Sequence, residues 1–260
     1  MEVPGAGNNK FWVLWSEFLG TGFLLVAVNW GGTSLNTPIC VGLTVMVLAQ
    51  IFGQISGGHF NPAVTVGMMI KHRHDNVAFN VVYGQMIIVF QVLGALAGCL
   101  FCTTAFVIFP QDDKKLPNAG SHYITQLCPV NGCNDGGKLL FKVFLVEVVM
   151  TFFFVSFVLQ IVKHNGAKDM PVNAMCIGIA LYAAIQIASG ISGGAINPAV
   201  GLAQPFYMKI MNGHAYPNAP NTRITYFPMY MFGSLLGGAL AGGFQRYIVE
   251  TALARGEAAQ

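Results

Sequence analysis

The chain has 260 residues, of which 54% are apolar and only 9% are charged. Soluble domains usually carry roughly 25% charged residues, so this composition excludes an ordinary soluble domain. The net charge is +3, from 13 Lys and Arg against 10 Asp and Glu. The basic residues lie in short loops and form no stripe, which argues against nucleic acid as a partner.

Long stretches without charge dominate the sequence. They run from Glu17 to Lys71, from Asp75 to Asp112, from Asp169 to Lys209 and from Arg223 to Arg246. A membrane-spanning helix needs about 20 mainly apolar residues, because lipid offers no partner to an unpaired backbone group. We therefore predict six spans, at residues 11–30, 38–55, 77–105, 139–163, 171–189 and 224–249. The first span shows no obvious cleavage site after its polar N-terminal flank, so we expect it to be retained.

Two further apolar segments, 56–70 and 190–206, are too short to cross a bilayer. They are related to each other. QIFGQISGGHFNPAV, residues 50–64, matches QIASGISGGAINPAV, residues 186–200, at ten of fifteen positions. The sequence is therefore internally duplicated around these two segments.

The duplication extends upstream, because Glu17 and Thr21 recur as Glu147 and Thr151. Each half then holds three spans and one short segment, over approximately 11–105 and 139–250, with a loop at 106–138 between them. An odd number of spans per half makes the second copy enter the membrane from the opposite face. We predict one channel domain over residues 1–260, in which the two short segments meet at the membrane midplane.

The repeated Gly-Gly-x-x-Asn-Pro-Ala pattern predicts a loop that becomes a half-helix. Paired glycines permit unusual backbone torsions, Asn61 and Asn197 can cap a helix, and Pro62 and Pro198 suit its first position. Irregular backbone at membrane depth is tolerated only where protein buries it or where it lines a wet cavity. Candidate acceptors along a pore are the carbonyls of Gly57, Gly58, His59, Gly193, Gly194 and Ala195.

Two half-helices that meet by their N-termini bring two positive dipole ends and two Asn amides to one point. Such a centre repels cations and orients water so that a chain of proton transfers is interrupted. The alternative is that Asn61 and Asn197 only cap helices in a packed core.

The duplicated Asn61-Pro62-Ala63 and Asn197-Pro198-Ala199 segments, the six spans and the two intramembrane acids resemble the aquaporin, or major intrinsic protein, family over essentially the full chain. The resemblance implies an all-α membrane fold of six transmembrane helices and two re-entrant half-helices, assembled as a homotetramer with one pore per subunit. It also implies that Glu17 and Glu147 hold the re-entrant loops. An acid within a span is costly and normally has a partner; a proton relay is the alternative role.

The chain departs from the family at its narrow filter. By the family spacing, the filter positions are Val41, Ile185, Gly194 and Val200, whereas most members have Arg directly after the second Asn-Pro-Ala. Loss of the Arg and of bulky aromatics predicts a wide apolar filter that passes water and small neutral solutes such as glycerol, urea, ammonia or hydrogen peroxide. Glycerol facilitators usually have Asp where this chain has Gly201. Two alternatives remain open: a water-selective pore with low solute flux, or a poorly conducting structural or gated protein.

The sequence shows no catalytic constellation and no metal-binding spacing, so we expect neither an enzyme nor a cofactor. A secondary transporter is the competing class, because inverted repeats also build carriers, but the spans offer few coupling groups.

Cys128 and Cys133 form either a local disulfide or two free thiols. We expect a multi-pass protein of the plasma membrane or a vacuolar membrane, and a slight excess of basic residues favours cytoplasmic termini.

Overall fold

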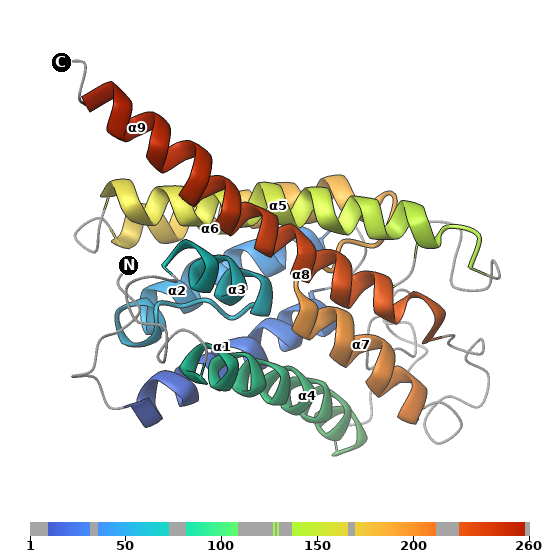
Figure 1. The fold of residues 1–260 in the computed structure, drawn as a ribbon. Helices are drawn as coiled ribbons and strands as arrows, with labels where there is room; N and C mark the ends of the chain where they lie inside the picture. The colour runs from blue at the N-terminus through green and yellow to red at the C-terminus, as the bar shows by residue number, and fades with distance from the viewer. Residues whose placement is uncertain are drawn as a thin grey trace.

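The computed structural model describes residues 10–31, 36–72, 82–108, 127, 129, 137–165, 170–211 and 224–257. Every regular element in these ranges is helical (Figure 1). The main helices are α1 (Lys10–Trp30), α2 (Thr37–Ser56), α3 (Pro62–Lys71), α4 (Gly84–Ile108), α5 (Leu140–Asn165), α6 (Met170–Ser189), α7 (Pro198–Met211) and α8 (Phe227–Phe244). A 3-10 turn, η3 (Ile224–Tyr226), precedes α8, and a π-helical turn, η4 (Gln245–Val249), joins it to α9 (Glu250–Glu257).

The all-α membrane fold predicted from the sequence is confirmed. Among the described residues, five helices are long and apolar enough to cross a membrane, namely α1, α2, α4, α5 and α6. The sixth predicted span corresponds to α8, which has only 18 residues, five of them glycine. The helix itself continues past the predicted end of the span at residue 249, because η4 and α9 extend it to Glu257. Similarly, α4 reaches Ile108, inside the predicted 106–138 loop.

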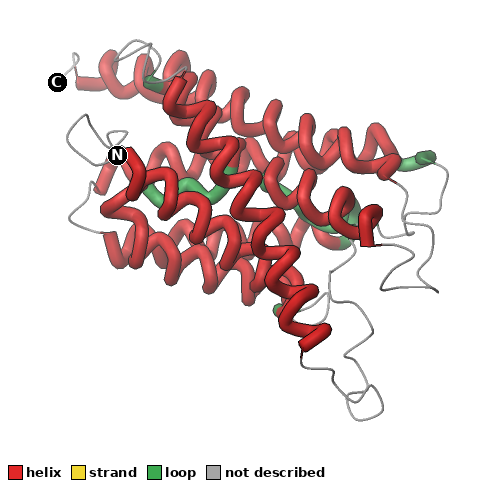
Figure 2. The backbone as a smooth tube through the Cα atoms, turned by 90° about the horizontal axis from the view of Figure 1, so that it is seen from below, coloured by secondary structure: helices red, strands yellow, loops and turns green. Residues whose placement is uncertain are grey.

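The two short segments form half-helices inside the bundle. Helix α3 has 10 residues and α7 has 14, so α7 passes the predicted end at residue 206 and includes Pro205. The two half-helices run from the middle of the bundle toward opposite ends (Figure 1). Their connecting loops lie within the bundle, as the green segments of Figure 2 show.

The packing of the first half is repeated in the second. Helix α1 packs against α4 and α2, and α5 packs in the same way against α8 and α6. Helix α2 contacts α6, while α3 lies on α8 and α7 on both α4 and α8. The start of α1 and the end of α9 lie at the same end of the bundle (Figure 1). Each half therefore contributes helices that surround the half-helix of the other.

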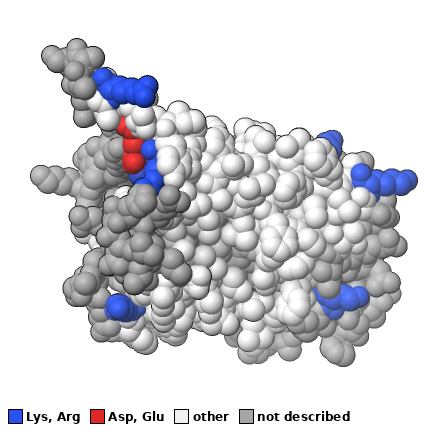
Figure 3. Space-filling model, in the orientation of Figure 1, with Lys and Arg blue, Asp and Glu red and all other residues white. Residues whose placement is uncertain are grey.

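The outer surface is suited to a bilayer. Figure 3 shows a broad face without charged side chains between basic side chains at the two ends. All three tryptophans lie on α1, and Trp12, Trp15 and Trp30 are 56%, 40% and 49% exposed. At 1.5 Å per residue, Trp12 and Trp30 are about 27 Å apart along the axis, close to the thickness of a hydrocarbon core. Exposed aromatic residues at this spacing are typical of the two membrane interfaces.

Candidate functional site

The loops that lead into α3 and α7 follow the same backbone path. Their φ angles are 92°, 65° and 48° at Gly57, Gly58 and Phe60, and 95°, 70° and 49° at Gly193, Gly194 and Ile196. Left-handed torsions are easy for glycine but costly for Phe and Ile, and such strain persists only where surrounding contacts impose it. The conformation is therefore held by the neighbours of each loop.

Asn61 and Asn197 cap the two half-helices. Asn61 Oδ1 accepts a hydrogen bond from the Ala63 N–H at 2.8 Å, and Asn197 Oδ1 accepts one from Ala199 at 2.9 Å. Pro62 begins α3, where its missing N–H leaves no helical hydrogen bond unmade. Both half-helices thus start at a side-chain cap and direct their remaining free N–H groups toward the centre of the bundle.

The same two side chains join the loops to each other. Asn61 Nδ2 donates to the Ile196 carbonyl and Asn197 Nδ2 donates to the Phe60 carbonyl, each at 2.9 Å. An Asn amide has two N–H donors, so one donor on each side chain has no partner among the described residues. These two remaining donors can bind a permeating oxygen atom.

Glu17 holds the first loop from α1. Its Oε1 accepts from the His59 N–H at 2.9 Å and from Ser56 Oγ at 2.6 Å. Its Oε2 accepts from the Phe60 N–H at 2.7 Å and from Gln91 Nε2 at 2.8 Å. Four donors on a fully buried carboxylate compensate for its removal from water.

Glu147 repeats this arrangement from α5. Its Oε1 accepts from Ser192 Oγ at 2.7 Å and from the Ala195 N–H at 3.1 Å. Its Oε2 accepts from the Ile196 N–H at 2.8 Å and from Ser234 Oγ at 3.3 Å. The two acids impose the strained backbone at Phe60 and Ile196, because each binds the N–H of that residue.

Several supporting residues were missed at the sequence level. Ser56 and Ser192 bind the two acids and occupy matching places in the repeat, which was a usable signal. Gln91 is a buried amide in an apolar span, and such a residue needs a partner. The Tyr230 hydroxyl donates to the Ser192 carbonyl, a contact that no sequence pattern indicated.

The candidate pore carbonyls are left available by the fold. Across the described ranges, no donor binds the carbonyls of Gly57, Gly58, His59, Gly193, Gly194 or Ala195. The His59 ring is nearly buried, and its Nδ1 lies 3.1 Å from Thr65 Oγ1. The loop backbone is therefore the main source of unused acceptors beside the Asn pair.

The four predicted filter positions form an uncharged group. Val41, Ile185 and Val200 are 4%, 7% and 5% exposed and belong to one apolar cluster at the centre of the bundle. A Cβ placed on Gly194 would lie 3.3 Å from Ile185 Cγ2, so these two residues are adjacent. No fixed charge or polar side chain comes from these positions.

Cys128 and Cys133 lie outside the described residues, so the choice between a disulfide and two free thiols stays open.

Comparison with known proteins gives concordant results. The model of the family described as major intrinsic protein matches residues 9–245. Aquaporin-4 of Bos taurus and of Homo sapiens are each 29% identical over 266 residues, covering 95% of this chain and 71% of the relative. The glycerol uptake facilitator protein-like 6 of Lactiplantibacillus plantarum is 33% identical over 191 residues, covering 71% of this chain and 78% of the relative.

The fold is also found among solved structures. The X-ray structure of the aquaglyceroporin from Plasmodium falciparum superposes with a TM-score of 0.70 at 19% sequence identity. The superposition covers 93% of this chain and 97% of that chain.

Proposed function

Because the chain belongs to the major intrinsic protein family, we propose that it forms a wide neutral-solute pore through its paired half-helices. The channel class itself follows from the family: the chain is a multi-pass transmembrane channel for water or small solutes, and it is not an enzyme. The proposal concerns which solutes pass and which groups select them.

Ion exclusion is assigned to the half-helix junction. Each half-helix N-terminus carries roughly half a positive charge, and both point at the same place. The reciprocal Asn61 and Asn197 hydrogen bonds support this role, because they fix the amides while leaving one donor on each. A water held by both donors cannot pass a proton along the file of waters.

Solute range is assigned to the four filter positions. Val200 stands where most family members have Arg, and the buried Val41 and Ile185 contribute only carbon atoms. An Arg would supply five N–H donors and a fixed charge, and it would narrow the opening. The observation that carries the proposal is therefore the absence of any charged or polar side chain at these positions. Glycerol, urea, ammonia and hydrogen peroxide are the candidate solutes besides water.

The same apolar wall favours a second candidate function. A constriction lined only by carbon atoms can expel water and close by dewetting. In that case the protein conducts poorly and serves a structural or gated role. A water-selective pore with low solute flux is the third alternative, and flux measurements separate all three.

The test replaces Val200 with Arg. Val200→Arg is expected to suppress glycerol and urea uptake into proteoliposomes at least tenfold while reducing water flux less. Val200→Met is the matched control, because it adds a long side chain without charge or donors. Equal loss of water and solute flux in Val200→Arg, or no change, would count against the filter assignment.

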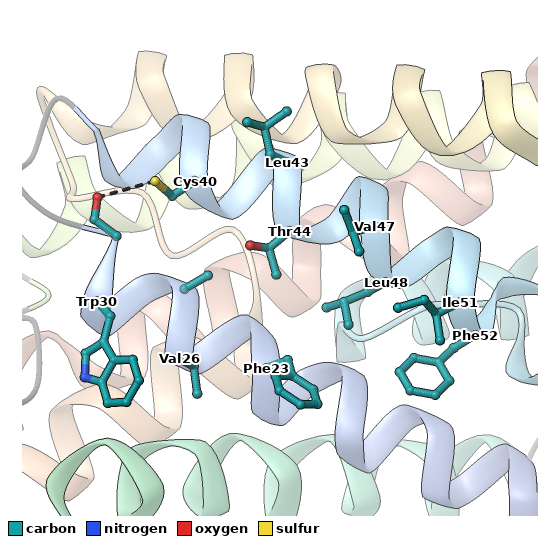
Figure 4. Close-up of a pocket in the computed structure, with 12 residues that line it drawn as sticks. Phe23, Val26, Trp30, Cys40, Leu43, Thr44, Val47, Leu48, Ile51 and Phe52 are labelled. Atoms are coloured by element: carbon teal, nitrogen blue, oxygen red, sulfur yellow. Dashed lines mark hydrogen bonds between the residues drawn. The ribbon is translucent and has the colours of Figure 1, made fainter. Parts of the chain in front are cut away.

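Assembly as a homotetramer is part of the proposal. It is supported by an open apolar cavity of about 580 Å³ between α1 and α2, lined by residues that include Phe23, Val26, Leu43 and Val47 (Figure 4). Leu43 and Val47 are about half exposed, so a neighbouring copy would bury them. If α1 and α2 form the contact between subunits, Val47→Lys is expected to shift the assembly from tetramer to monomer in native mass spectrometry. Val89→Lys, at an exposed site on α4, is the control and should shift the assembly less.

We further propose a plasma or vacuolar membrane location with both termini in the cytoplasm. The shared end of α1 and α9 supports placing the termini on one side of the membrane (Figure 1). Protease protection of tags at the two ends of the chain, in sealed vesicles of known orientation, tests this arrangement.

A further inference from the structure

Some buried polar atoms without partners belong to residues of α5 and η4, two elements that are in contact. Within the described part of the chain, five such side-chain atoms occur, and three of them are Ser156 Oγ, Gln160 Oε1 and Gln245 Oε1. Buried polar atoms normally have a partner in the protein or in ordered water, so each orphan calls for an explanation. Three orphans on two elements in contact raise the question of a shared ligand.

The three residues lie where α5 meets η4. Ser156 and Gln160 are one turn apart on α5 and therefore project from the same face. Gln245 is only 2% exposed, and its Nε2 donates to the Ser156 carbonyl at 3.0 Å. That hydrogen bond brings the Gln245 amide against this face of α5, with its Oε1 unused.

The π-helical turn makes this junction possible. Gln245 reaches α5, while the next residue, Arg246, donates from Nη1 to the carbonyls of Ile70 and Lys71 at the end of α3, at 3.0 and 3.1 Å. Lys71 Nζ in turn donates to the Leu159 carbonyl of α5 at 2.9 Å. The turn thus ties α8 to both α3 and α5, and π turns are frequent at functional sites.

The chemistry of the orphan atoms defines the ligand. The two amide oxygens only accept hydrogen bonds, so the ligand must donate. The neighbouring Lys71 and Arg246 charges disfavour a cation, and the acceptor lone pairs disfavour an anion. The remaining class is a small neutral donor. A buried water typically makes about three hydrogen bonds, which equals the number of orphan atoms.

We propose that Ser156, Gln160 and Gln245 bind an internal water molecule that joins α5 to η4. This water would lie near the C-terminal end of α3, because Arg246, the residue after Gln245, binds the carbonyls of Ile70 and Lys71 there. It would therefore stabilise the packing around the C-terminal end of the half-helix α3. The site does not depend on which solutes the pore passes.

The first test uses the sign of a stability change. Gln160→Met keeps the side-chain length but replaces the amide, and with it the orphan oxygen, by a thioether. If water is bound, the variant loses a hydrogen bond and the Tm in detergent should fall by about 2–4 °C. If the site is dry, removal of an unpartnered oxygen should raise the Tm, and that result would overturn the proposal. Gln85→Met, at an exposed position of α4, is the matched control.

A second measurement needs no variant and stays decisive if Gln160→Met fails to fold. Water-edited solid-state NMR on the full-length protein in bilayers, with Gln side chains labelled, reports which amides contact water. We expect rapid magnetisation transfer to Gln160 and Gln245. Gln91 is the internal control, because it is buried and its amide is bound by Glu17 and Thr65. Transfer to Gln160 and Gln245 no faster than to Gln91 would contradict a bound water.

Discussion

Asn61 and Asn197 each donate a hydrogen bond to the loop that carries the other, at the same distance of 2.9 Å. The acceptors are the carbonyls of Ile196 and Phe60, the residues whose φ angles are 49° and 48°. Each half of the chain therefore holds the strained backbone of the other half. This reciprocity makes the junction one cooperative unit instead of two independent caps.

Removal of one Asn should loosen both loops. Asn61→Ala loses the Ala63 cap and leaves the Ile196 carbonyl unpartnered, which we expect to cost about 2 kcal/mol of stability. Thermal unfolding in detergent measures the change. Because the two sides are joined, the effects of Asn61→Ala and Asn197→Ala should not add in the double variant. Additive losses would show that the caps act independently.

Replacement of a buried acid by its amide should destabilise the protein. Glu147→Gln keeps the shape but points an N–H₂ group at donors from Ser192, Ala195 or Ile196, so we expect a loss of about 3 kcal/mol. Ser234→Ala is the milder comparison, since its hydrogen bond to Glu147 is 3.3 Å long. Yield, Tm and flux should all fall further in Glu147→Gln. An equal effect of the two changes would argue against Glu147 as the loop anchor.

Much of this site was readable from the repeat. The duplicated segments predicted two half-helices capped by Asn61 and Asn197, because an Asn-Pro pair at a helix start has a direct physical reading. The cross-loop hydrogen bonds were not predictable, since they depend on where two segments 136 residues apart meet (61 against 197). The π-helical turn at Gln245 was also missed, because local periodicity does not distinguish it from a continuing α-helix.

Close packing of α8 on α3 depends on a missing side chain. A Cβ on Gly238 would overlap the carbonyl oxygen of Ala63, the residue whose N–H binds Asn61. Gly238→Ala should therefore destabilise the protein by about 1–3 kcal/mol. Gly243→Ala is the matched control on the same helix, because nothing lies within 4 Å of its Cβ, and it should be neutral or stabilising. A comparable loss in both variants, measured by thermal unfolding, would contradict the packing argument.

The most direct test of the account measures permeation by the unaltered protein. Stopped-flow swelling of proteoliposomes should compare water, glycerol and urea on one preparation, with an internal dye that reports pH. The account predicts fast uptake of water and of both solutes without acidification, because the filter is apolar and the Asn junction interrupts proton transfer. Fast water flux without solute flux would contradict the assignment of Val41, Ile185, Gly194 and Val200, and solute flux accompanied by acidification would contradict the role of the Asn junction.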